Sequence, residues 1–117
     1  MGDYKQLTAW QKSMDLVEEV YVCTRDFPKE EMYGLTGQIR RAAISIPSNL
    51  AEGATRAGVK EFLQFLHIAR GSASELETQL LLAIRIGYLP TKQNLISNLI
   101  GVKQLINGLI RSLKEKQ

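Results

Sequence analysis

The chain has 117 residues, which suits one domain with one hydrophobic core, and its 44% hydrophobic and 23% charged residues are typical of a globular protein rather than a disordered one. A net charge of +3 permits a nucleic-acid partner but does not require one. The single cysteine, Cys23, excludes an internal disulfide, and without a leader pattern or a long apolar run we expect a cytoplasmic protein with no membrane span.

The first predicted helix covers residues 8–25. Thr8 and Gln11 form a capping-box pattern at its start, and Asp26-Phe27-Pro28 ends it because proline disfavours helical geometry in the preceding residue. Apolar spacings of four and three predict a stripe facing the core, made of Trp10, Met14, Val17, Tyr21 and Thr24. Trp10 and Tyr21 could instead stack on nucleotide bases, but side chains on such a stripe are more often core. Cys23 is interpreted as a helix-surface thiol.

The second predicted helix covers residues 35–53 and contains Pro47. An interior proline removes one backbone hydrogen bond and crowds the carbonyl four residues earlier. Because the polar and apolar positions keep their phase across Pro47, we expect a kink rather than a break. The alternative is that Asn49 caps a separate helix.

The third predicted helix covers residues 59–86, and Gly87-Tyr88-Leu89-Pro90 ends it, glycine first and proline after. Its apolar arc is wide enough to predict burial on more than one side. Leu63 and Leu81 fall outside that arc.

The fourth predicted helix covers residues 92–115, with Thr91 as its cap. Gly101 and Gly108, one heptad apart, are expected to let a neighbouring backbone approach closely. The predicted seam alternates by four and three residues: Leu95, Leu99, Val102, Ile106, Leu109 and Leu113. Four helices with short connections predict an all-α, antiparallel up-down-up-down bundle in a single domain, residues 1–117.

Polar residues form stripes beside the apolar faces of the second and third helices. The first stripe is Gln38, Arg41, Ser45, Asn49 and Glu52, and the second is Ser72, Glu75 and Gln79. We predict a structural network between the two helices, with Arg41 as a buried cation for Glu52 and Glu75. The alternative is a catalytic pair formed by the two glutamates.

A small second apolar face on the second helix, formed by Ile44, Pro47 and Ala51, adds to Leu63 and Leu81 as apolar surface that a monomeric bundle would expose. Such surface usually marks a partner, and we expect self-association.

The sequence offers no catalytic residue, metal ligand or cofactor site that we would assign. A di-iron bundle needs Glu-x-x-His pairs, whereas the only histidine, His67, follows Gln64 and is expected on the surface. The small-residue turn of residues 51–60 lacks the order of a phosphate-binding loop, although its amides and cations could hold a phosphate. The candidate nucleic-acid-binding cations are Arg40, Arg56, Lys60 and Arg70.

Several segments resemble the bacterial four-helix-bundle family encoded by 23S rRNA intervening sequences. The most specific is Ser45-Ile46-Pro47-Ser48-Asn49-Leu50-Ala51-Glu52-Gly53, and the likeness extends over roughly residues 7–113. The other matching segments are Phe27-Pro28, Tyr33-Gly34-Leu35, Gln38-Ile39-Arg40-Arg41-Ala42, Ile68-Ala69, Gly71-Ser72, Glu75-Leu76-Glu77 and Gly87-Tyr88-Leu89.

This resemblance implies an antiparallel four-helix bundle that assembles into a homopentamer. It also implies kinship with the accessory variability protein of diversity-generating retroelements, a basic pentamer that binds nucleic acid and a reverse transcriptase. The family carries no established biochemical activity, so the resemblance supplies no catalytic residues.

The leading hypothesis is a non-enzymatic, oligomeric scaffold associated with RNA or a nucleoprotein. The alternative is a protein–protein interaction module with no nucleic-acid role. An enzyme would need a polar cavity around Glu52 and Glu75.

Overall fold

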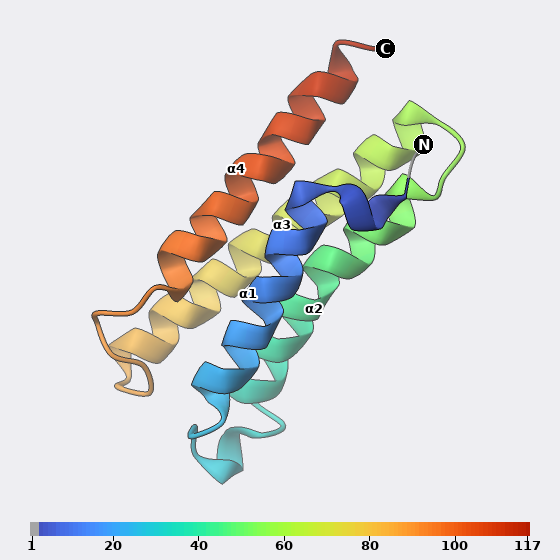
Figure 1. Cartoon of the computed structure of the whole chain (residues 1–117). Coiled ribbons are helices and arrows are strands. Elements are labelled where there is room, and N and C mark those ends of the chain that lie inside the picture. Colours follow the sequence, from blue (N-terminus) through green and yellow to red (C-terminus); the bar gives the residue numbers. More distant parts are fainter. Residues whose placement is uncertain (1–2) are drawn as a thin grey trace.

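The computed structural model describes residues 3–117, which form four α-helices, two short 3₁₀-helices and no strand (Figure 1). In chain order the elements are η1 (Tyr4–Gln6), α1 (Thr8–Thr24), η2 (Lys29–Glu31), α2 (Leu35–Ala54), α3 (Val59–Arg85) and α4 (Leu95–Lys114). Each long helix packs against the next along the chain, and α4 packs against α1 to close the bundle. The expected up-down-up-down bundle is confirmed, in a body of 45 × 24 × 20 Å.

The predicted core stripe of α1 is wrong for Met14 and Tyr21, whereas Thr24 is buried and Trp10 and Val17 pack against the edge of the core. Met14 and Tyr21 are 39% and 38% exposed, and Trp10 and Val17 are half-buried. The residues that face the core are Ala9, Ser13, Leu16, Val20 and Thr24. Two of these are hydroxyl residues whose Oγ atoms donate to carbonyls of their own helix, Ser13 to Trp10 at 2.9 Å and Thr24 to Val20 at 2.8 Å. Because these bonds satisfy the hydroxyls, the two side chains are tolerated in the core.

α2 runs without interruption through Pro47, which is buried. The alternative in which Asn49 caps a separate helix is therefore wrong, and the kink at Pro47 stays a prediction. The Asn49 amide Nδ2 donates to the Ser45 carbonyl at 2.8 Å, which gives this polar side chain a backbone partner beside the proline.

Two predicted helix caps, Thr8 for α1 and Thr91 for α4, are wrong. Leu7, not Thr8, precedes the first turn of α1, and the Gln11 side chain donates to the Lys5 carbonyl at 2.9 Å. α4 begins at Leu95 rather than near Thr91, and the Gln93 side chain accepts from the Ile96 N–H at 3.2 Å.

The predicted end of α3 at Gly87 is confirmed. Gly87 has a φ of 87°, a left-handed conformation that glycine adopts without steric cost. The Tyr88 N–H then bonds the Ala83 carbonyl at 2.9 Å and the Gly87 N–H bonds the Ile84 carbonyl at 3.1 Å, the Schellman pattern of a helix C-terminus.

The α3 and α4 faces match their predictions with three changes. Leu63 is only 6% exposed and so belongs to the core, whereas Leu81 is 46% exposed as expected. On α4 the seam holds except that Ile110 is buried where Leu109 is half-buried. The predicted close approach at Gly101 and Gly108 is wrong within this chain, because an added Cβ at either would meet no atom within 4 Å.

Candidate interaction surfaces

Polar side chains connect α2 to α3 at the middle of the bundle. The Ser45 and Ser72 hydroxyl oxygens lie 2.8 Å apart, and Asn49 Nδ2 also donates to Ser45 Oγ at 2.9 Å. All three residues are half-buried, so the contacts link the helices at the edge of the core. The structure thus brings together three of the eight residues predicted to form the polar network.

Four others line one open pocket between α2 and α3. It has a volume of about 460 Å³ and is lined by Gln38, Arg41, Glu75, Thr78 and Gln79. The predicted burial of Arg41 is wrong, because Arg41 and Glu75 are both exposed and neither belongs to the two ion pairs found among residues 3–117. Gln79 Oε1 is buried there without a hydrogen-bond partner.

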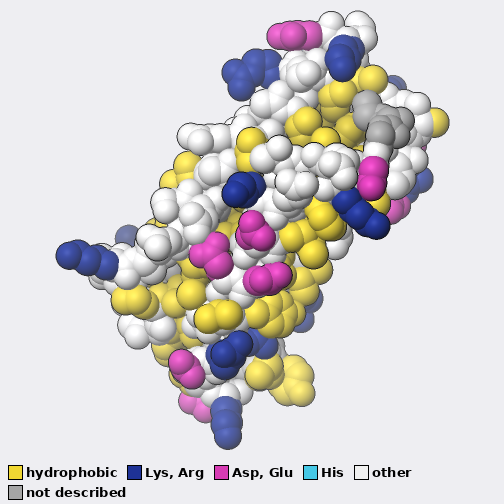
Figure 2. Space-filling model, in the orientation of Figure 1, with side chains coloured by type: hydrophobic (Ala, Val, Ile, Leu, Met, Phe, Trp, Pro, Cys, Tyr) yellow, Lys and Arg dark blue, Asp and Glu magenta, His cyan; other side chains and the backbone are white. Residues whose placement is uncertain are grey.

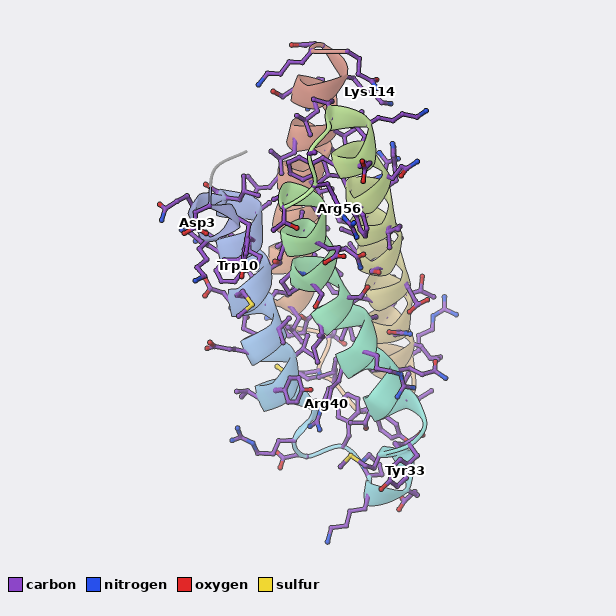
Figure 3. The ribbon with its side chains drawn as sticks, turned by 90° about the vertical axis from the view of Figure 1, so that its right-hand side faces the viewer. Asp3, Trp10, Tyr33, Arg40, Arg56 and Lys114 are labelled. Carbon is purple, nitrogen blue, oxygen red and sulfur yellow. The ribbon has the colours of Figure 1, made fainter. Side chains whose placement is uncertain are left out.

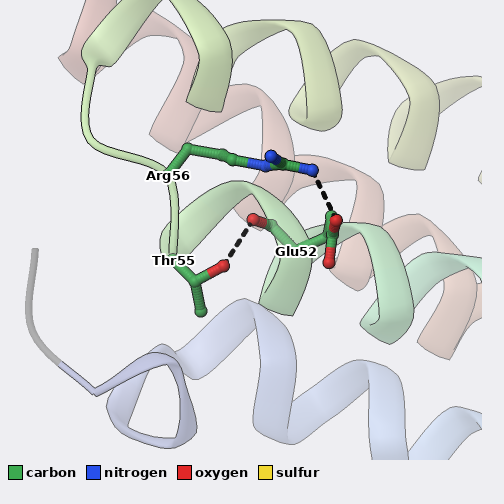
Figure 4. Close-up of polar contacts among 3 residues, drawn as sticks. All are labelled: Glu52, Thr55 and Arg56. Carbon is green, nitrogen blue, oxygen red and sulfur yellow. Dashed lines mark hydrogen bonds and ion pairs between the residues drawn. The ribbon is translucent and has the colours of Figure 1, made fainter.

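Glu52 lies away from this pocket, in the last turn of α2 (Figure 4). Its carboxylate pairs with Arg56 one helical turn later, and its carbonyl accepts from the Thr55 hydroxyl at 2.9 Å. The Arg56 guanidinium also lies 5.0 Å from the centre of the Phe65 ring. Because Glu52 and Glu75 do not face a common cavity, the geometry of a paired-carboxylate acid and base is not formed.

The four predicted nucleic-acid-binding cations do not form one cluster, and Figure 3 shows Arg40 and Arg56 at different levels of the bundle. Arg40 turns toward α1, where its Nε donates to Thr24 Oγ1 at 3.0 Å and its guanidinium lies 4.6 Å from the Tyr21 ring centre. Arg70 turns toward α4 and donates to Asn107 Oδ1 at 3.1 Å. Arg56 and Lys60 remain near one another in sequence at the α2–α3 turn.

Lys60 shares its end of the bundle with cations from α4, a group that the sequence reasoning missed. Antiparallel packing, marked by the Arg70–Asn107 contact, places the start of α3 beside the end of α4. The last turn of α4 carries Arg111 and Lys114, both exposed. We call Lys60, Arg111 and Lys114 the cationic end; Lys114 and Arg56 appear in the same part of Figure 3.

An apolar groove follows the border between α1 and α2, where hydrophobic side chains gather in Figure 2. It has a volume of about 280 Å³ and is lined by Tyr4, Trp10, Met14, Val17, Ile44, Pro47 and Ser48. Three residues of the stripe that was expected to enter the core, Trp10, Met14 and Val17, therefore line one wall of a surface groove. Ile44 and Pro47, predicted as a second apolar face of α2, form the other wall.

A tyrosine–carboxylate contact ties the α3–α4 connection to the start of α2, and no sequence pattern indicated it. The Tyr88 hydroxyl donates to Glu31 Oε2 at 3.0 Å, while Glu31 Oε1 accepts from the Leu35 N–H at 3.2 Å. The hydrogen bond to Glu31 raises the pKa of Tyr88, with burial and the glutamate charge adding to the shift. The Tyr88 ring packs on Phe27, with ring centres 5.3 Å apart.

Neither Cys23 nor His67 belongs to a cluster of side chains that could bind a metal ion within the described residues. Cys23 is half-buried rather than on the open helix surface, and burial together with the Glu19 charge raises the pKa of its thiol. His67 is exposed, and its Nδ1 lies 2.9 Å from an Arg70 nitrogen. Within residues 3–117, no three His, Cys, Asp or Glu side chains lie close enough to bind one metal ion. None of the described helices has the length and apolar character needed to cross a bilayer.

The family model described as 23S rRNA-intervening sequence protein matches residues 5–108. The chain belongs to this family. A solved structure from Bacteroides thetaiotaomicron, described as a protein with unknown function from the S23 ribosomal protein family, has the same fold. Its TM-score is 0.81 at 23% sequence identity, covering 88% of this intervening-sequence protein and 95% of the other chain. None of the curated proteins compared with the chain matches it.

Proposed function

We propose that this intervening-sequence protein is a non-enzymatic, cytoplasmic scaffold that works as an oligomer of its own chain. The observation that carries the proposal is the amount of large apolar side chain left on the outer helix faces. Ile44, Leu81, Leu82 and Ile86 are 41–48% exposed and Ile68 is 51% exposed. Exposed apolar area of this kind usually marks a surface that associates with a partner. The separation of Glu52 from Glu75 supports a role without catalysis.

Light scattering of the full chain at micromolar concentration tests self-association. The expected result is a multiple of the 13.1 kDa subunit mass, and the family resemblance suggests five subunits. A particle of 13.1 kDa that persists on concentration would refute the proposal.

The cationic end favours RNA as the partner of this assembly. Lys60, Arg111 and Lys114 are exposed, and none belongs to the two ion pairs found in the described chain. In an oligomer each subunit repeats these charges, and contacts with phosphate groups add up. The family name refers to intervening sequences of 23S rRNA, which makes structured ribosomal RNA the first ligand to test.

RNA binding is tested by substituting two cations at this end. Lys60→Gln with Lys114→Gln should weaken binding of a structured rRNA fragment several-fold and reduce its dependence on salt concentration. Lys29→Gln with Lys92→Gln is a charge-matched control, because it removes two exposed lysines near the other end of the bundle. Binding that is absent, insensitive to salt, or equally weakened by both pairs would contradict this role.

The apolar groove between α1 and α2 favours a second candidate, a protein-interaction module. The groove contains Trp10, Met14 and Ile44, and aromatic and methionine side chains are enriched at protein interfaces. This role predicts that purified protein retains a defined partner after nuclease treatment. Loss of that partner in Ile44→Lys, with the bundle still folded, would locate the contact, whereas unchanged retention would contradict it.

A further inference from the structure

The open pocket between α2 and α3 begins one helical turn beyond the Ser45–Ser72 contact. Because the two helices are antiparallel, one turn back from Ser45 on α2 lies beside one turn forward from Ser72 on α3. These two steps lead to Arg41 and Glu75, so helical spacing and antiparallel packing bring a cation and an anion to the same pocket. The pocket has a volume of about 460 Å³, and its lining residues are Gln38, Arg41, Glu75, Thr78 and Gln79.

On the α2 wall, the Arg41 guanidinium lies against Gly37, one helical turn earlier. A Cβ added at Gly37 would lie 3.5 Å from Arg41 Nη1 and 3.8 Å from Nη2, which is ordinary van der Waals contact. The missing side chain of the glycine therefore gives the guanidinium room beside the helix. Arg41 is exposed and belongs to neither ion pair within residues 3–117. A guanidinium in this state can bind a carboxylate through two parallel hydrogen bonds.

The α3 wall of the pocket presents hydrogen-bond acceptors. The Glu75 carboxylate is exposed and is likewise outside the two ion pairs of the described chain. Gln79 Oε1 is buried without a hydrogen-bond partner, and because the terminal torsion of glutamine is broad, a small rotation turns this oxygen toward a donor in the pocket. The Thr78 hydroxyl donates to the Ser74 carbonyl at 3.0 Å, so its oxygen can still accept.

The lining of the pocket narrows the class of ligand. All five lining residues are polar, so an apolar molecule would gain little there. A nucleotide would meet a single guanidinium and the like charge of Glu75, and no aromatic side chain lines the pocket as a platform for its base. Within residues 3–117, Glu75 belongs to no cluster that could bind a metal ion. The ligand that fits is a small polar molecule with one negative and one positive group.

We propose that the pocket between α2 and α3 binds a free α-amino acid. The carboxylate of the ligand pairs with the Arg41 guanidinium, and its ammonium group donates to the Glu75 carboxylate and Gln79 Oε1. An α-amino acid carries both groups on one carbon atom, so it supplies each wall with the opposite charge. Gln38 and Thr78 line the rest of the pocket and favour a side chain that forms hydrogen bonds over an aliphatic one. This site depends on neither self-association nor RNA binding.

Isothermal titration calorimetry of the full chain with glutamine, asparagine, serine and leucine tests the site. We expect saturable binding of at least one of the three polar amino acids at millimolar concentration or below, and weaker binding of leucine. For the amino acid that binds most tightly, the N-acetyl derivative lacks the ammonium group and the α-amide derivative lacks the carboxylate. Each derivative should bind at least tenfold more weakly, because one wall of the pocket then keeps an unpaired charge. Absence of binding by all three polar amino acids overturns the proposal.

Two substitutions locate the binding in this pocket. Arg41→Gln and Glu75→Gln should each weaken binding of the amino acid at least tenfold. Arg85→Gln and Glu18→Gln are the charge-matched controls, because both residues are exposed and neither lines the pocket. Thermal unfolding without ligand checks that each variant is folded. Unchanged binding in Arg41→Gln or Glu75→Gln, an equal loss in the controls, or equal binding of either derivative overturns the proposal.

Discussion

Gly53 lies where the end of α2 passes the start of α3, and it has no room for a side chain. An added Cβ would lie 2.7 Å from the Phe65 Cβ and 2.9 Å from Phe62 Cδ1. Gly53→Ala should therefore lower the free energy of unfolding by about 1–3 kcal/mol, despite the better helix propensity of alanine. Chemical denaturation measures this. Gly71→Ala, in open space, should instead be neutral or raise stability by up to about 1 kcal/mol, and equal effects at the two sites would contradict the packing argument.

We expect different effects on stability from substitutions in the two parts of the polar stripes, the Ser45–Ser72 contact and the open pocket that contains Arg41 and Glu75. Ser72→Ala removes the partner of Ser45 and should cost about 0.5–1.5 kcal/mol of unfolding free energy. Arg41→Ala and Glu75→Ala should each change it by less than about 0.5 kcal/mol, because both side chains are exposed and unpaired with one another. A large loss in either of the last two would show that Arg41 and Glu75 support the fold after all.

At the scale of elements, the contact between Tyr88 and Glu31 joins the α3–α4 connection to η2 and α2. The raised pKa of Tyr88 means that the folded state favours the neutral phenol. Its contribution to stability is therefore complete below the ordinary tyrosine pKa of 10.0 and is lost as pH rises through the higher folded value. Above pH 10.0, unfolding curves should show a steeper loss of stability in the wild type than in Tyr88→Phe. An equal loss of stability with pH in the wild type and in Tyr88→Phe would contradict a stabilising contact between Tyr88 and Glu31.

The helices themselves could be predicted from sequence because their apolar residues recur with the helical period over several turns. The face of α1 that enters the core could not be predicted in the same way, because α1 carries two adjacent stripes of residues at helical spacing. The stripe that enters the core includes Ser13 and Thr24, whose hydroxyls are satisfied inside their own helix. The more apolar stripe, with Trp10 and Met14, lies beside the surface groove. A hydrophobicity pattern alone favours the second stripe.

The candidate sites were less predictable than the helices because they depend on which side chains meet across elements. Spacing placed Arg41 and Ser45 on one stripe, but Ser45 meets Ser72 while Arg41 extends into an open pocket. Likewise, Gly101 and Gly108 were correctly placed on a flank of α4. Whether another backbone packs against these glycines depends on how the helices pack, and within this chain no atom lies within 4 Å of an added Cβ at either one.

On the scale of the whole molecule, apolar and charged surfaces are divided among different faces of one slender bundle. The exposed apolar side chains of α3, Ile68, Leu81 and Leu82, are assigned to self-association, the cationic end to RNA, and the α1–α2 groove remains available to a protein partner. Such a division allows one small chain to assemble and still bind other molecules. Its function would then depend on oligomerisation, since a single copy presents only a few unpaired cations at any one place.

Native mass measurement with and without a structured rRNA fragment tests this account most directly. At low salt we predict a particle whose mass is a multiple of 13.1 kDa and which gains the mass of the RNA when the fragment is added. Raising the salt concentration should release the RNA and leave the protein particle intact. A 13.1 kDa species that the RNA does not change would contradict the scaffold and its partner together.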